Sequence, residues 1–363
     1  MEGLWIGCAF LMGHAVKKVG LPALVGYLLA GFIINSINGY FSLGDTASDV
    51  LNKVAHVGIL LLLFSVGLKL KVSQVVKKEV VGTGVLHMLI SLVMFTPFIM
   101  FMFGEDLKVA IVLAGLFSFS STVLAVKVLD NKQELKAFHG RIAIGILIIQ
   151  DLLAMIMLSA TSGHLPSVWA ILVALIAFLP VTKTVLYKIL DKSGHDEMLM
   201  LCGLVLAVVV GGQGFHYVGL SGELGALVVG VRCSQHEKSN ELSKSLWGIK
   251  ELFLVAFFLT IGLNGMPTLD DVYFAFAMVA LLPLQALAFF GLLTLFKLKA
   301  RSAFLASMSL TNFSEFGLIV AAVAAPEWII PVALAVALSF VVSAPLNHFS
   351  HQLFSRYENR PAY

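Results

Sequence analysis

The chain has 363 residues, of which 59% are hydrophobic and only 12% are charged. Soluble domains carry about 25% charged residues, so this composition excludes a soluble globular protein and indicates a polytopic membrane protein. The net charge of +3 comes from basic residues spread over many loops, which argues against a nucleic-acid partner. The three cysteines are scattered without CxxC spacing, so neither a disulfide framework nor a tightly bound metal or other cofactor is expected.

Thirteen apolar runs are candidates for membrane-spanning helices, because a hydrocarbon core of about 30 Å requires roughly 17 to 25 apolar residues. The first run has no basic n-region and no small-residue cleavage site, so a spanning helix is expected there rather than a removable signal. The ninth run is short. In chain order the expected helices are 3–17, 22–40, 50–68, 80–103, 107–127, 139–160, 166–187, 197–213, 218–231, 247–264, 271–296, 302–325 and 329–350.

The basic residues predict the orientation of these helices in the membrane. Of the 24 Lys and Arg residues, all but Lys53 and Lys108 lie at the end of an odd-numbered run or in the segment that follows it. Because Lys and Arg concentrate in cytoplasmic loops, the pattern places the N-terminus outside and the C-terminus in the cytoplasm.

An internal repeat is predicted from three pairs of similar segments that occur in the same order at nearly the same offset. The first pair lies on runs two and nine, a shift of seven spans, and an odd shift inverts the second copy relative to the first. Inverted repeats are typical of transporters, whose substrate site lies between the halves. The expected repeats cover about 20–160 and 218–350, and the pairs are "LPALVGYLLAG" with "LSGELGALVVG", "LFSVGL" with "FLTIGL", and "FSFSST" with "TNFSEF".

The run "ILIIQDLLAMI" places Gln150 and Asp151 among apolar residues. Asp151 lies ten residues after Arg141, the last basic residue of a loop, which is about 15 Å along a helix and half of the hydrocarbon thickness. A buried carboxylate is costly without a partner, and at such depth it commonly marks an ion or proton route. The alternative is a permanently protonated carboxyl that serves packing. Gln150 either lines the same cavity or hydrogen-bonds a neighbouring helix.

The segment "FSFSSTV" interrupts the fifth run with hydroxyl residues, among them Ser120, Ser121 and Thr122. Such side chains compete for backbone carbonyls, so the helix can loosen and expose oxygen atoms that suit an alkali cation. The alternative is that these small residues only permit close helix packing.

The matching segment "SLTNFSEFGLI" carries Asn312, Ser314 and Glu315 near the middle of the twelfth run. Glu315 is interpreted as a second titrating group, a structural partner, or a carboxylate that offsets the dipole of a broken helix. Of the remaining polar residues, His14, His87 and His216 are expected to be hydrogen-bonded core residues, and Glu223 is expected to stabilise the start of the ninth helix.

Over essentially its whole length the chain resembles the cation:proton antiporter-2 family, nearest the Kef-type potassium/proton systems. The segments that carry the resemblance are "GLPALVGYLLAG", "ILLLLFSVGLKL", "SFSSTVLAVKVL", "GRIAIGILIIQDLLA", "ELGALVVG", "LFLVAFFLTIGL" and "NFSEFGLIVAA". The resemblance implies an all-α inverted-repeat antiporter in a bacterial inner membrane, with a dimerisation domain and a core domain. It also implies two crossing unwound helices, at Ser120 to Thr122 and Asn312 to Glu315, beside the ion-binding Asp151.

The expected function is exchange of a monovalent cation for protons, without enzymatic chemistry. Proton and cation would compete for Asp151, while Gln150, Ser120, Ser121 and Thr122 would complete the cation shell and Asn312, Ser314 and Glu315 would support it. Sodium exchangers of the family carry two adjacent acids at this place, so Gln150 favours potassium. A sodium/proton antiporter and a regulated potassium efflux channel are the alternatives.

The expected partners are the lipid bilayer, a second copy in a homodimer, and a separate or removed cytosolic regulatory domain. The 363 residues contain no GxGxxG loop after a strand, so no nucleotide-binding domain is expected within them. The loop "RCSQHEKSNELSKSLWGIK" is rich in lysine where Kef loops carry an acidic inhibitory stretch, so glutathione gating is not expected.

Overall fold

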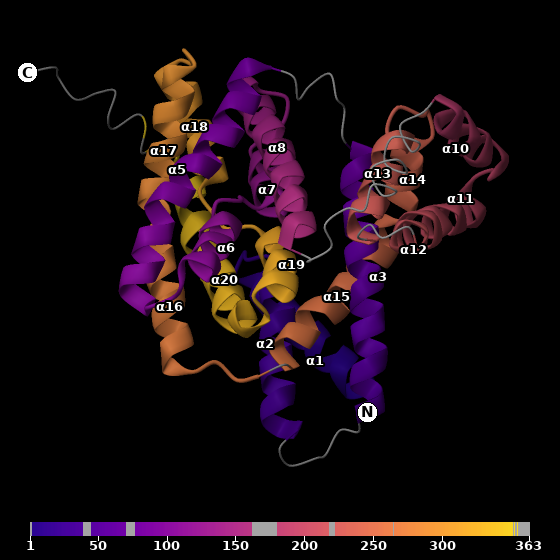
Figure 1. The fold of residues 1–363 in the computed structure, drawn as a ribbon, viewed down its shortest axis with the longest axis horizontal. Helices are drawn as coiled ribbons and strands as arrows, with labels where there is room; N and C mark the ends of the chain where they lie inside the picture. Colours follow the sequence, from indigo (N-terminus) through magenta and orange to yellow (C-terminus); the bar gives the residue numbers. More distant parts are fainter. Residues whose placement is uncertain are drawn as a thin grey trace, which may run out of the picture. The chain divides into compact units, whose positions relative to one another are not determined.

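A computed structural model describes residues 2–38, 45–69, 77–161, 180–217, 222–263 and 265–350, together with Gln352 and Phe354. In these residues every regular element is a helix, as the composition predicts (Figure 1). The elements are α1 (Glu2–Lys18), α2 (Ala23–Asn38), α3 (Asp45–Lys69), α5 (Lys78–Phe103), α6 (Leu107–Phe117), α7 (Thr122–Asn131), α8 (Phe138–Thr161), α10 (Pro180–Lys192), α11 (Asp196–Leu204), η1 (Val205–Gln213), α12 (Gly214–Tyr217), α13 (Gly222–Cys233), α14 (Ser239–Ser245), α15 (Trp247–Leu263), α16 (Leu269–Ala280), α17 (Leu282–Leu295), α18 (Ala300–Leu310), α19 (Glu315–Ala324), η2 (Pro326–Trp328) and α20 (Ile329–His348).

The expected number of thirteen spans is not confirmed. Within the described residues, six helices are long and apolar enough to cross a membrane, or up to eight if each of two bent pairs is one span. Shorter apolar helices account for part of the difference, and one of them, α6, ends at a break. The expected seventh span lies partly outside the described residues, since 166–179 are not among them.

Local capping signals explain where several helices begin and end. Gly104 closes α5 in the left-handed conformation, with φ 72°, which glycine adopts without a Cβ penalty. Asp106 then caps α6, because its carboxylate accepts a hydrogen bond from the Val109 N–H at 2.8 Å. Thr268 and Asp271 form a capping box at the start of α16. The turns between spans are thus specified by the local sequence.

The chain folds into two compact units, each built from segments of both predicted repeats. Unit one comprises 1–10, 27–72 and 159–264. Unit two comprises 11–26, 73–158 and 265–363. Within unit one α3 packs against α13 and α15, and Figure 1 shows α3 and α13 side by side.

Glycines permit two close helix crossings in unit one. A Cβ on Gly31 of α2 would lie 2.7 Å from the Cα of Gly262 in α15. A Cβ on Gly230 of α13 would lie 3.1 Å from the Cα of Gly67 in α3. The sequence repeat pairs Gly31 with Gly230 and Gly67 with Gly262, so it maps one crossing onto the other. This correspondence supports the inverted repeat.

The predicted helix over 197–213 is not a regular α-helix throughout. It is α-helical in α11, and η1 (Val205–Gln213) then has the wider π-helical turn. A Cβ on Gly211 would lie 2.5 Å from the Cα of Ala226, so η1 and α13 approach closely there. The apolar sequence alone does not reveal this π-helical stretch, since such turns are rare.

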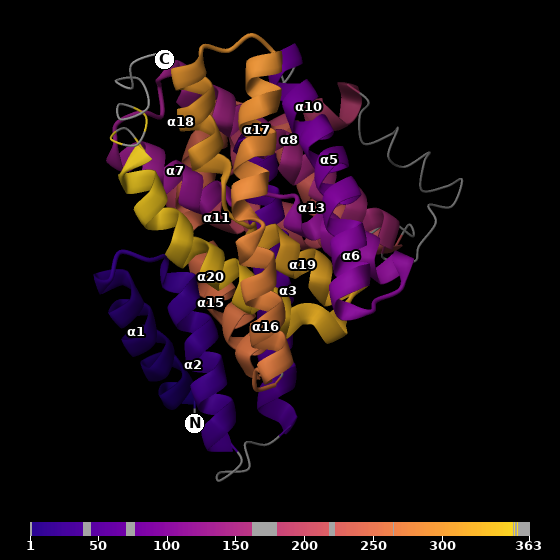
Figure 2. The same ribbon diagram turned by 90° about the vertical axis from the view of Figure 1, so that its left-hand side faces the viewer.

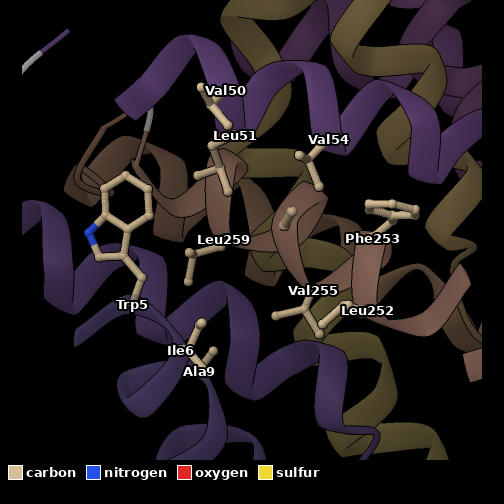
Figure 3. A pocket seen from close by; sticks show the side chains of 11 residues that line it. Trp5, Ile6, Ala9, Val50, Leu51, Val54, Leu252, Phe253, Val255 and Leu259 are labelled. Carbon is tan, nitrogen blue, oxygen red and sulfur yellow. The ribbon is translucent and has the colours of Figure 1, made fainter. Parts of the chain in front are cut away.

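Unit one contains an apolar hollow of about 540 Å³ between α1, α3 and α15. Figure 3 shows the lining side chains, among which the Trp5 indole nitrogen is the one polar side-chain atom. The side chains of the hollow therefore offer no oxygen ligand for a cation, and the polar residues singled out from the sequence lie elsewhere. Its lining residues are Trp5, Ile6, Ala9, Val50, Leu51, Val54, Leu252, Phe253, Val255, Ala256 and Leu259.

Unit two contains α5 to α8 and α16 to α20, including α16 and α17, which follow one another along one line in Figure 2. An aromatic cluster joins several of these helices. The Phe274 ring of α16 lies 5.8 Å from the Phe117 ring of α6 and 4.7 Å from that of Trp328. Such ring pairs contribute about 0.5–1.5 kcal/mol beyond the area that they bury. The cluster packs beside the two breaks described next.

Candidate functional site

The first break separates α6 from α7. The α6 helix ends at Phe117, and α7 begins at Thr122. The Ser118 hydroxyl donates to the Gly115 carbonyl at 2.6 Å, and the Ser121 hydroxyl accepts from the Leu124 N–H at 3.1 Å. These serines replace backbone partners that the break removes, which is the role that the hydroxyl-rich sequence predicts.

The second break separates α18 from α19, whose axes differ by 48°. The Thr311 hydroxyl donates to the Ser307 carbonyl at 2.7 Å, while the Ser314 hydroxyl caps α19 by accepting from the Phe316 N–H at 3.1 Å. Glu315 is the first residue of α19 and is buried. A negative charge at this position is favoured by the helix dipole.

The two breaks contact each other directly. The Ser121 N–H donates to Oδ1 of Asn312 at 2.6 Å, and Nδ2 of Asn312 donates to the Ser309 carbonyl at 3.0 Å. The rings of Phe117 and Phe313, which flank the breaks, pack edge to face with centroids 4.8 Å apart. The crossing of two unwound helices, which the family resemblance implies, is therefore present in unit two.

Asp151 of α8 lies at the first break. Its side chain accepts a hydrogen bond on Oδ2 from the Thr122 hydroxyl at 3.1 Å, and only 3% of the residue is exposed. Glu315, at the start of α19, is a second buried carboxyl at the breaks. Two buried carboxylates repel each other unless a proton or a cation neutralises part of their charge. The arrangement thus favours uptake of a positive charge.

Gln150 joins the two sides of the first break. Its Oε1 accepts from the Ser120 N–H at 3.1 Å, and its Nε2 donates to the Ser118 carbonyl at 3.1 Å. Of the two interpretations made from the sequence, hydrogen bonding to a neighbouring segment is therefore observed. A role of Gln150 in a cation shell stays a prediction, because an amide oxygen retains a second lone pair.

The hydroxyl of Ser120 is buried and makes no hydrogen bond within the described part of the chain. A buried hydroxyl without a partner is unfavourable by about 1–3 kcal/mol, so a water molecule or a cation would stabilise it. All eight site residues predicted from the sequence lie at these two breaks or on the adjoining α8: Ser120, Ser121, Thr122, Gln150, Asp151, Asn312, Ser314 and Glu315.

Two serines of α20 were not predicted as part of this region. The Ser339 hydroxyl accepts from the Phe313 N–H at 3.1 Å, and the Ser343 hydroxyl donates to the Thr311 carbonyl at 2.6 Å. Both bonds satisfy backbone groups that the second break exposes. The two serines are four residues apart in an apolar helix and therefore lie on one face of it. This spacing is the feature of the sequence from which their role could have been predicted.

The expectations for the other polar residues hold only in part. His87 is buried as expected, and its ring stacks on Phe289 with the ring centroids 3.5 Å apart. His14 and His216 are exposed, so their prediction as core residues is wrong. Apolar neighbours in sequence do not distinguish a helix face in the core from one at the surface. Glu223 lies in the first turn of α13 as expected, 3.9 Å from His56.

Comparison with known proteins agrees with this architecture. The family model described as "Sodium/hydrogen exchanger, transmembrane" matches residues 6–347. The solved structure of the sodium proton antiporter MjNhaP1 from Methanocaldococcus jannaschii matches with a TM-score of 0.69 and 14% identity, over 97% of both chains. At this identity the match demonstrates the fold alone, and it confirms the predicted all-α antiporter fold.

Curated relatives carry the names of cation/proton transporters. The chain is 27% identical to the putative cation/proton antiporter YbaL of Escherichia coli (strain K12), over 86% of this chain and 60% of YbaL. It is 25% identical to the ammonium/H(+) antiporter subunit AmhT of Alkalihalophilus pseudofirmus, over 89% of this chain and 85% of AmhT. It is 28% identical to the glutathione-regulated potassium-efflux system protein KefC of Enterobacter sp. (strain 638), over 94% of this chain and 58% of KefC.

The chain thus spans about three fifths of the length of YbaL and KefC. The similarity to KefC confirms the Kef-type resemblance that the sequence motifs indicate, and members of the matched family are transporters, not enzymes. Since the family model covers almost all of the chain and the fold agrees, this multi-pass membrane protein belongs to the sodium/hydrogen exchanger family.

Proposed function

We propose that this chain forms the membrane domain of an antiporter that exchanges potassium for protons at Asp151. One observation carries the proposal: a buried carboxylate is hydrogen-bonded to the first of two helix breaks that contact each other. Such breaks expose backbone oxygens in the interior of a transporter, where coupling ions are coordinated. Asp151 would bind the cation, with oxygens of Ser120, Ser121, Thr122 and Gln150 in its shell.

Competition for one carboxylate is sufficient for exchange. The protonated and the cation-bound forms of Asp151 carry no net charge at that group, so both can be carried between inward-open and outward-open states. The bare carboxylate is costly to bury and cannot make this transition readily. Asn312, Ser314 and Glu315 would hold the second break in place. One cation per proton is the simplest expectation.

The identity of the cation is the finer part of the proposal. The relatives' names differ here, since KefC is named for potassium, AmhT for ammonium and MjNhaP1 for sodium. The amide of Gln150, at a place where resembling sodium exchangers have an acid, supports potassium. A sodium/proton antiporter is the alternative of the same fold, and a regulated potassium efflux channel is the alternative mechanism.

The proposed arrangement in the membrane follows from the charge pattern and the resemblance. We place the N-terminus outside and the C-terminus in the cytoplasm of a bacterial inner membrane, with two copies forming a homodimer. A cytosolic regulatory domain, attached or separate, is proposed as a further partner because KefC is longer than this chain.

The test uses purified protein in liposomes that contain a pH-sensitive dye. After a proton gradient is imposed, potassium, rubidium, ammonium, sodium and lithium are added in turn. We expect potassium and rubidium to dissipate the gradient better than lithium, and Asp151→Asn to abolish the exchange. The matched control is Asp270→Asn, which removes an exposed carboxylate from the first turn of α16.

Each alternative has its own outcome. Wild-type flux in a folded Asp151→Asn variant would remove Asp151 from the mechanism. A preference for sodium or lithium over potassium would favour the sodium antiporter. A potassium current without obligatory proton movement would identify a channel.

A further inference from the structure

A second hollow, of about 460 Å³, lies in unit two at the start of α5 and α8. Its lining comes from three segments, namely the start of α5, the connection that precedes α8, and the first two turns of α8. At one side of it α5 and α8 touch, because a Cβ on Gly145 would lie 2.9 Å from the Val80 side chain. The residues that line the hollow are Lys77, Val80, Leu135, Lys136, Phe138, Arg141, Ile142, Ile144 and Gly145.

The hollow is strongly positive. Lys77, Lys136 and Arg141 line it, and no acidic residue of the described ranges does. All three side chains are exposed, and none forms a salt bridge with a described residue. Like charges that converge on one cavity without a counter-charge repel each other, so an anion bound there would be stabilised by all three.

The rest of the lining is apolar, which indicates the kind of anion. The other six lining residues are Val80, Leu135, Phe138, Ile142, Ile144 and Gly145, and the Phe138 side chain is among the exposed large hydrophobic ones. A free inorganic anion gains nothing from such a surface. A phospholipid combines a charged phosphate with a glycerol and acyl region that would cover it.

The position of the hollow along α8 suits a lipid headgroup. Arg141 precedes Asp151 by ten residues on one helix, or about 15 Å along its axis. If Asp151 lies near the middle of the membrane, Arg141 lies at its surface, and both α5 and α8 are long enough to continue through the hydrocarbon. This is the face to which the Lys and Arg pattern assigns the cytoplasm.

We propose that this hollow binds the headgroup phosphate of an anionic phospholipid of the cytoplasmic leaflet. Lys77, Lys136 and Arg141 contact the phosphate, and the apolar lining contacts the glycerol and the beginning of an acyl chain. Because the lipid would touch both α5 and α8, it would tie together two helices of unit two, one of which carries Gln150 and Asp151.

The test measures binding of a fluorescent phosphatidylglycerol to purified protein in zwitterionic detergent. The pocket variant is Lys77→Gln with Lys136→Gln and Arg141→Gln. The control variant is Lys188→Gln with Lys192→Gln and Lys244→Gln, which removes three exposed lysines of unit one that line neither hollow. A second pocket variant, Ile144→Trp, keeps every charge and fills the hollow. Size-exclusion chromatography identifies the folded variants.

We expect wild type and control to bind the lipid alike, and each folded pocket variant to bind it at least tenfold more weakly. Phosphatidylglycerol should also raise the melting temperature of the wild type, whereas inorganic phosphate and phosphatidylcholine should not. Equal lipid binding by the wild type and a folded pocket variant would overturn the proposal. The same melting shift with inorganic phosphate would overturn it too, because the site would then bind free anions. Both readouts are independent of transport by Asp151.

Discussion

Replacing Gln150 by leucine removes both hydrogen bonds that join the two sides of the first break, with little change in side-chain volume. The Ser120 N–H and the Ser118 carbonyl would then lose their partners. Both serines are fully buried, so bulk water does not readily replace the amide. The variant therefore isolates the contribution of one side chain to the geometry of the break.

The expected magnitude follows from the cost of unsatisfied buried groups. A buried donor or acceptor that loses its partner costs about 1–3 kcal/mol, so the two groups together cost about 2–6 kcal/mol in the free energy of unfolding. This is a large part of the roughly 5–15 kcal/mol by which a typical protein is stable. We expect Gln150→Leu to lower the melting temperature by several degrees and to reduce transport strongly.

The chain offers a matched control for the same chemical change. Gln285 of α17 is as buried as Gln150, with 1% exposed, but its amide makes no hydrogen bond with a described residue. Gln285→Leu removes a buried polar group without stranding a partner, so stability should stay constant or rise. Thermal unfolding of both variants in the same detergent, followed by tryptophan fluorescence, measures the difference between them.

Two results would refute this reasoning. If both variants lost equal stability, the hydrogen bonds of Gln150 would contribute nothing beyond the general effect of the replacement. If Gln150→Leu transported cations like the wild type, the geometry of the first break would not depend on the amide.

Two further predictions concern the helix contacts. Asn312→Ala strands the Ser121 N–H and the Ser309 carbonyl, so it should lower the free energy of unfolding by about 2–6 kcal/mol. An unchanged free energy of unfolding in chemical denaturation would exclude these two bonds as a significant contribution. Gly31→Ala would place a Cβ 2.4 Å from the Leu259 carbonyl oxygen and should cost about 1–3 kcal/mol. The control is Gly291→Ala, whose added Cβ meets nothing within 4 Å, so the free energy of unfolding should rise by up to about 1 kcal/mol. If Gly31→Ala were as stable as the wild type, the close contact between α2 and α15 would not contribute to stability.

Much of the helical framework could be read from the sequence because lipid permits few backbone structures. A spanning segment must satisfy its own backbone groups, so a long apolar run becomes a helix almost irrespective of its details. The expected run 80–103 accordingly corresponds to α5 (Lys78–Phe103). The two breaks were equally visible, since Ser120 and Asn312 belong to polar groups in otherwise apolar runs.

What the sequence could not specify are the partners across those breaks. The bond from Ser121 to Asn312 joins residues that are far apart in the chain, and Ser339 and Ser343 contribute because α20 packs beside the second break. The same reason applies to η1, which takes a π-helical turn where α13 approaches it. A hydrogen-bond partner depends on which helix faces lie together, and apolar spans leave that choice open.

The sequence by itself determined that this is a helical membrane protein with a carboxylate at Asp151 in the middle of a span and two interrupted helices. Only the tertiary structure decided that the interrupted helices meet, that Thr122 donates to Asp151, and that Gln150 hydrogen-bonds to the backbone at both ends of the first break. The physical reason is one of range. Whether a segment is buried in lipid depends on its own composition, so it can be predicted for each segment separately. A hydrogen bond over about 3 Å depends on how several segments pack together.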